Sequence, residues 1–105
     1  MAKQINPERE LGLSTSLINL STAPNPFYPR SDISFTVPQS ESGYPVQVKV
    51  FSITGKCVAT LVDDAQMQAG RFTVTLDGTN LPTAEYIVRV MEHDYQQTGI
   101  LVLVK

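Results

Sequence analysis

The sequence has 105 residues, of which 42% are hydrophobic and 17% are charged, and its net charge is -2. This length suits one domain, and the low charge density disfavours a long solvated helix or a disordered chain. The slightly acidic balance offers no field for a phosphate backbone, so we expect no nucleic-acid partner. The longest apolar run, residues 100–104, is far shorter than the roughly 20 residues of a membrane-spanning helix. We therefore expect no membrane span.

Residues 1–16 are polar and are interrupted by Pro7 and Gly12, which favours a flexible lead-in or linker. They lack the apolar stretch of a secretory signal peptide. If the protein is exported, its signal must lie upstream, and the chain is then a fragment of a larger precursor. We place one folded domain at residues 17–105.

From residue 17 onward, apolar and polar residues alternate with a period of two. In one run Ile33, Phe35 and Val37 alternate with Ser34 and Thr36. Such alternation is typical of strands with one buried face, and turn residues recur at the spacing of a sandwich. The pattern predicts strands at residues 17–23, 32–37, 46–53, 56–62, 70–76, 85–91 and 96–104. The expected fold is all-β, a single Ig-like antiparallel β-sandwich of about seven strands.

The predicted turns depend on proline and glycine. Pro24 and Pro26 flank Asn25, and their fixed φ angles and missing donors favour an extended entry over a helix. Gly55 lies in a tight hairpin, where glycine supplies a positive φ without steric cost. We expect the same of Gly70 and Gly78.

Catalytic chemistry has few candidates in this sequence. His93 is the sole histidine and Cys57 the sole cysteine. His93 lies between two predicted strands, where an exposed turn explains it better than a base–nucleophile pair. Cys57 is expected to be a small buried residue, since little around it favours a thiolate. One histidine and one cysteine do not make a Cys/His zinc site, and no disulfide can form within the chain.

The loop acids and the aromatic residues have alternative interpretations. Asp63 with Asp64, or Asp77 with Asn80, could offer oxygen ligands to calcium, although paired acids usually only solvate a turn. Four aromatic residues could form a sugar-stacking surface, although packing at the core or edge is the commoner role; they are Tyr28, Tyr44, Phe51 and Tyr95. We therefore predict no catalytic residue, no metal site and no cofactor, and a protein that is not an enzyme.

The order of motifs carries more information than any one of them. The chain opens with Ala-Pro-Asn-Pro-Phe-Tyr-Pro at residues 23–29, continues with Ile-Thr-Gly-Lys at 53–56, and ends with Ile-Leu-Val-Leu-Val-Lys at 100–105. Together with the Ala-Gly and Asp-Gly turns at 69–70 and 77–78, this order resembles the type A C-terminal sorting domain of the type IX, or Por, secretion system of Bacteroidetes. An Ig-like domain of the flagellar hook-capping protein shares the hairpin and both turns.

The resemblance implies a targeting role. Such a domain is linked to an upstream cargo, reaches the periplasm, is recognised by the outer-membrane machinery and is usually removed by a sorting peptidase, which leaves the cargo secreted or on the cell surface. The expected partners are therefore that machinery, its peptidase and the cargo. The expected sorting signal is the final segment, in which one row of side chains can be buried and the other presented; it comprises Leu101, Val102, Leu103, Val104 and Lys105.

Two further possibilities stay open at this point. The domain could be an Ig-like accessory module that binds carbohydrate or protein, or a structural domain like that of the hook cap. A small sandwich also has exposed edge strands, so an edge-strand homodimer is possible.

Overall fold

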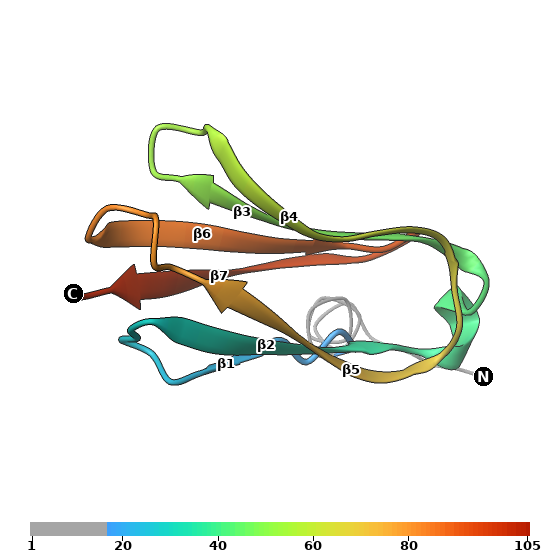
Figure 1. The fold of residues 1–105 in the computed structure, drawn as a ribbon. Helices are drawn as coiled ribbons and strands as arrows, with labels where there is room; N and C mark the ends of the chain where they lie inside the picture. The colour runs from blue at the N-terminus through green and yellow to red at the C-terminus, as the bar shows by residue number, and fades with distance from the viewer. Residues whose placement is uncertain (1–16) are drawn as a thin grey trace, which may run out of the picture.

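The computed structural model describes residues 17–105, so the predicted lead-in at residues 1–16 lies outside the described part. Two antiparallel sheets face each other (Figure 1). The three-stranded sheet has the order β1-β2-β5, and the four-stranded sheet has the order β4-β3-β6-β7. The strands are β1 (Ser21–Ala23), β2 (Arg30–Val37), β3 (Tyr44–Ser52), β4 (Cys57–Met67), β5 (Gly70–Asp77), β6 (Ala84–Met91) and β7 (Gln96–Leu103). The prediction of a seven-stranded all-β sandwich is confirmed.

The core lies between the two sheets and is built by the alternation seen in the sequence. In β2 the side chains of Ile33, Phe35 and Val37 are buried, and in β3 those of Val46 and Val48 are buried. Strands β6 and β7, which lie in the same sheet as β3, contribute their inward-facing side chains to this core. Each strand therefore places alternate residues in one shared core, as expected for packed sheets.

Five predicted strands match the structure to within two residues at each end, and the other two differ by four or five residues at one end. The strand expected at 17–23 shortens to β1, because Asn19 adopts a positive φ of 49° and interrupts the extended chain. Ile18 is nevertheless fully buried, and its carbonyl accepts a hydrogen bond from the Thr36 N–H at 2.7 Å. The strand expected at 56–62 continues to Met67, because β4 stays paired with β3 as far as Tyr44 and Met67 despite three register shifts.

The glycine predictions are only partly right. Gly55 has a φ of +95° and Gly70 a φ of +154°, as expected for residues at turns. Gly78 is not among the glycines with positive φ, so its predicted role is wrong. A Cβ at Gly78 would lie 3.0 Å from Phe27 and 3.1 Å from Leu103. Glycine is needed there because core side chains pack directly against the backbone.

Tyr86 fixes the corner where the chain enters β6. Its ring is buried and its hydroxyl donates a 2.6 Å hydrogen bond to the carbonyl of Pro82, four residues upstream. This is the geometry of the tyrosine corner of Ig-like sandwiches, in which a tyrosine near the start of a strand anchors the preceding loop. The feature supports the Ig-like assignment independently of strand order.

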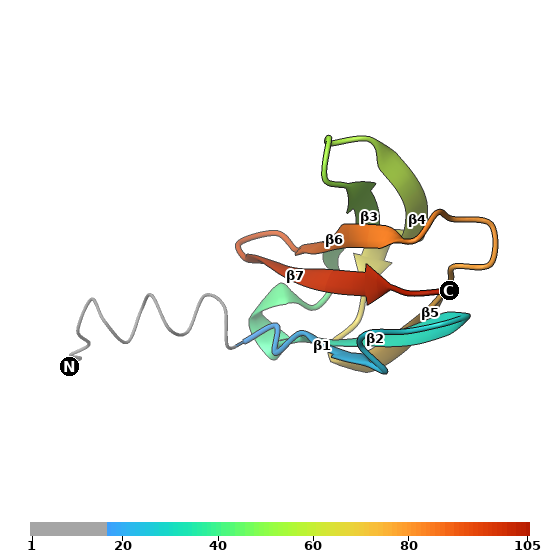
Figure 2. The ribbon, with the colours of Figure 1, turned by 90° about the vertical axis from the view of Figure 1, so that its left-hand side faces the viewer.

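The turn between β6 and β7 lies at the opposite end of the sandwich from Lys105, beside the short 3-10 helix η1 (Gln39–Glu41) that joins β2 to β3 (Figures 1 and 2). Within residues 17–105, no helix has the length and apolar character needed to cross a membrane.

Candidate functional site

Strand β7 and the two residues after it divide the predicted sorting signal into two rows. The inner row, Leu101 and Leu103, is fully buried in the core. The outer row, Ile100, Val102 and Val104, points away from the core, and Ile100 and Val104 are 59% and 52% exposed. The inner row therefore stabilises the fold, and only the outer row is available to a partner.

The Asn25 side chain forms the hydrogen bonds that a neighbouring strand would form along the free edge of β7. Its side-chain Nδ2 donates to the carbonyl of Ile100 at 2.7 Å, and its Oδ1 accepts from the N–H of Val102 at 2.9 Å. A side-chain amide offers one donor and one acceptor, as does a peptide group, so it can occupy two places on a strand edge. This explains why an asparagine between two prolines can satisfy the edge.

Phe27 extends the same edge with its backbone. Its N–H donates to the carbonyl of Val102 at 2.8 Å, and its carbonyl accepts from the N–H of Val104 at 3.1 Å. The Phe27 side chain is buried. Residues 24–27, which we call the clamp loop, thus cover the edge of β7 from Ile100 to Val104 and tie the two sheets together.

Lys105 is held against the loop that joins β5 to β6. Its N–H donates to the hydroxyl of Thr83 at 3.2 Å, and its ammonium group donates to the carbonyl of Thr79 at 2.8 Å. Both interactions are exposed, so the positive charge remains accessible at this end of the sandwich.

The outer row continues onto β6. Ile100 lies opposite Ile87 in the β6–β7 pairing, and Ile87 lies opposite Phe51 in the β3–β6 pairing. The guanidinium of Arg89 covers the Phe51 ring at 5.1 Å from its centroid. The outer face of the four-stranded sheet therefore carries an apolar band that reaches the chain end at Val104.

The other candidates are spread over the molecule. Cys57 is exposed, so the prediction of a buried cysteine is wrong: it begins edge strand β4, immediately after the hairpin turn. Asp63 and Asp64 lie within β4 and not in a turn, with Asp63 accepting a hydrogen bond from Gln47 at 3.3 Å. Among the described residues, neither Asp63 nor Asp64 belongs to a group of side chains spaced to bind a metal ion.

Asp77 caps the turn that follows β5. Its Oδ1 accepts from the Thr79 hydroxyl at 2.6 Å and from the Thr79 N–H at 2.9 Å. These two bonds hold the pKa of Asp77 below its ordinary value, and the charge of Arg30 lowers it further. Asp77 therefore has a local structural role.

The four aromatic residues do not share one surface. Tyr44 stacks on His93, with ring centroids 4.1 Å apart, beside the turn that precedes β7. Tyr28 follows Phe27, which pairs with Leu103 at the far end of β7. The eight residues of β7 separate these two ends by roughly 25 Å. Tyr95 packs on the core, and Phe51 lies under Arg89.

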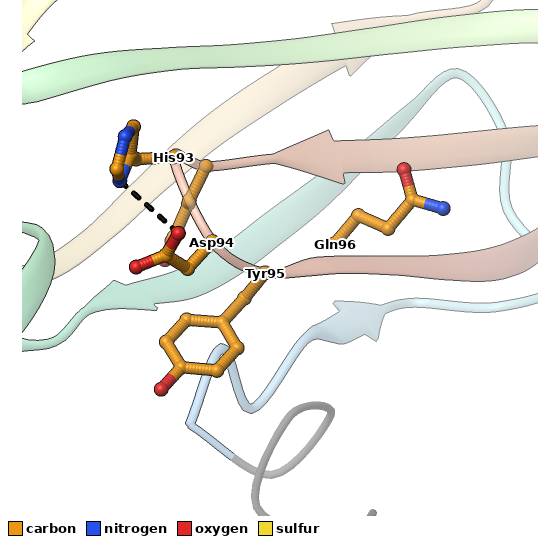
Figure 3. A pocket seen from close by; sticks show the side chains of 5 residues that line it. His93, Asp94, Tyr95 and Gln96 are labelled. Carbon is orange, nitrogen blue, oxygen red and sulfur yellow. Dashed lines mark ion pairs between the residues drawn. The ribbon is translucent and has the colours of Figure 1, made fainter.

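The β6–β7 turn contains a polar cluster that the sequence did not reveal. His93 and Asp94 are exposed and lie in the turn, as predicted for His93 (Figure 3). The turn packs against Glu41 of η1, which is fully buried although it is acidic. Burial raises the pKa of Glu92 to about 7, and the nearby charge of Glu41 adds to this effect. Residues 41 and 92 are far apart in the sequence, so no short-range sequence pattern could have predicted that they lie close together.

The fold and its last strand define a class: a small Ig-like antiparallel sandwich that presents one row of its terminal segment and buries the other. Comparison with known families gives the particular family. The chain belongs to the secretion system C-terminal sorting domains, whose pattern it matches over residues 21–104. This confirms the resemblance to the type IX sorting domains and gives the chain a targeting role in that secretion system. No curated protein matches the chain.

Proposed function

We propose that this domain directs an upstream cargo through the outer-membrane machinery of type IX secretion to the cell surface or the medium, and that the machinery contacts the outer row of β7 together with Lys105. The observation that carries the proposal is the division of the terminal segment. Leu101 and Leu103 are fully buried, whereas Val104 is 52% exposed and Lys105 is exposed. An apolar row ending in a cation offers a partner both contact area and a charge.

The cargo would be attached through residues 1–16, and the sorting peptidase would cut before Ile18. Three hydrogen bonds support this limit. The Ile18 carbonyl accepts from Thr36 at 2.7 Å, the Asn19 carbonyl accepts from Arg71 at 2.7 Å, and the Leu20 N–H donates to Gln97 at 3.1 Å. A peptidase needs an extended, accessible backbone, and residues 18–20 are tied to the sandwich.

The proposal is tested by secretion of a periplasmic reporter fused ahead of residue 1 in a host with type IX secretion. The variant Val104→Ser/Lys105→Gln changes only exposed groups and should leave the reporter in the periplasm. The control is Ile53→Ser, because Ile53 is 69% exposed in the β3–β4 turn and outside the proposed contact. Surface delivery by the double variant at the wild-type level would refute the assignment of the contact surface.

The alternative of a carbohydrate-binding accessory module needs neighbouring aromatic rings. Tyr28 and Tyr44 lie at opposite ends of β7, and the Tyr44 ring is already covered on one side by His93. A Tyr28→Ser variant that lost glycan binding but kept secretion would favour this alternative.

A further inference from the structure

Glu41 is a fully buried carboxylate with one unused oxygen. It ends η1, and its Oε1 accepts a 2.7 Å hydrogen bond from the N–H of Asp94. Its Oε2 is buried and has no hydrogen-bond partner among residues 17–105. A buried carboxylate oxygen without a partner is costly, by several kcal/mol in the ionised form. Something outside the described chain is expected to offset this cost.

Glu92 adds a second buried acid to the same region. It is 9% exposed, and neither of its carboxylate oxygens has a partner within the described part of the chain. Buried carboxylate oxygens without hydrogen-bond partners favour a bound cation, because its positive charge offsets their cost of desolvation.

Two solvent-accessible ligands border the buried acids. His93 Nδ1 lies 3.2 Å from Asp94 Oδ1, with both side chains about half exposed or more (47% and 64%) (Figure 3). Stacking on Tyr44 restrains the imidazole ring of His93. One ligand atom each from Glu41, His93 and Asp94 lie within 4.8 Å of one another.

We propose that Glu41, His93 and Asp94 form a binding site for a divalent transition-metal ion of the Zn²⁺ type. One imidazole and two carboxylates are a donor set that suits zinc, whereas calcium and magnesium favour oxygen ligands alone. Zinc–ligand bonds of about 2.0–2.2 Å place tetrahedral ligand atoms roughly 3.4 Å apart. The ligand atoms lie within 4.8 Å of one another, and rotation of the exposed Asp94 side chain can bring them to this spacing. Water can supply the fourth ligand.

The ion would join two connections that, within residues 17–105, are linked by one side-chain hydrogen bond, from the Asp94 N–H to Glu41. Glu41 belongs to the β2–β3 connection and the other two ligands to the β6–β7 turn. Binding to the folded state alone stabilises it by mass action. The site lies at the end of the sandwich away from Lys105 (Figure 1), so it leaves the proposed contact surface free.

The test uses the full chain with Cys57→Ser, which removes the only thiol, after treatment with a chelator. Calorimetric titration with Zn²⁺ should show one saturable site. Thermal unfolding in the presence of Zn²⁺ should show a raised Tm. His93→Gln should weaken the affinity at least tenfold, and because His93 is exposed this variant should still fold. Glu41→Gln should also abolish binding. Asp63→Asn, which removes the same charge from exposed β4, is the matched control and should bind as the parent does.

Absence of saturable Zn²⁺ binding would overturn the proposal. Binding that His93→Gln leaves unchanged would overturn it as well, because the ion would then lie elsewhere. Tighter binding of Ca²⁺ than of Zn²⁺ would contradict the use of the imidazole as a ligand.

Discussion

The hydroxyl of Tyr86 is a single group whose contribution can be measured. It donates to the Pro82 carbonyl at 2.6 Å from a buried ring. Tyr86→Phe keeps the ring and removes this bond, so we expect the free energy of unfolding to fall by about 1 kcal/mol. Tyr28→Phe is the control, because Tyr28 is half exposed, and it should leave the value unchanged. Urea titration of both variants checks the difference, and equal stabilities would show that the corner contributes nothing.

The lowered pKa of Asp77 predicts how the free energy of unfolding depends on pH. The hydrogen bonds from Thr79 make its pKa lower in the folded chain than the ordinary value of 3.8. The unfolded chain therefore binds a proton at Asp77 more readily than the folded chain does. The resulting stabilisation is present above pH 3.8 and is lost as the pH falls through the lower folded pKa.

Asp77→Asn should accordingly flatten the acid limb of the stability curve, as measured by urea titration across that range. Thr79→Val keeps the carboxylate but removes the stronger of its two donors, so it should flatten the same limb in part. An acid limb in Asp77→Asn that runs parallel to that of the parent would contradict this account.

The clamp loop shows how one element protects the edge of another. Unpaired strand edges promote association between copies, and Asn25 closes the edge of β7 at Ile100 and Val102. Asn25→Ala should remove both bonds and speed amide exchange at Val102 about tenfold, since each 1.4 kcal/mol of local stability changes exchange tenfold. Asn80→Ala, in the exposed loop before β6, is the control. Exchange can be followed residue by residue with NMR.

The same variant bears on the predicted edge-strand homodimer. If β7 pairs with a second copy once its edge is opened, Asn25→Ala should elute as a larger species at high concentration and Asn80→Ala should not. The edge of β4 is less suited to pairing, because its register shifts and the exposed Asp63 and Asp64 disturb a regular ladder.

The strands were predictable because their signal is local. Alternation over five or six residues is enough to place β2 and β3, whose inner rows are buried throughout. In β4 the sequence located the strand but not its full length or the exposure of Cys57, because an edge strand with register shifts has no regular alternation. The contacts of the candidate sites could not be predicted from local sequence patterns. Asn25 reaches Ile100 across 75 positions and Glu41 reaches Asp94 across 53, and only the packing of the two sheets brings these residues together.

At the scale of the whole molecule, targeting and folding share the terminal segment. The inner row fills the core between the sheets, and the backbone of the segment binds the clamp loop. A partner that reads the outer row therefore contacts a surface that exists only in the folded domain. Folding and recognition are coupled through β7.

This coupling predicts the result of deleting residues 101–105. The deletion removes Leu101 and Leu103, each fully buried, and such losses cost about 2–5 kcal/mol per residue. Small domains have a total stability of only about 5–15 kcal/mol. The truncated chain should therefore be largely unfolded, with far-UV circular dichroism showing loss of strand signal and protease digesting it rapidly. Val104→Ser/Lys105→Gln should keep the strand signal and resist digestion. A truncated chain that stayed folded would show that the inner row is dispensable, and loss of secretion on truncation would then report recognition directly.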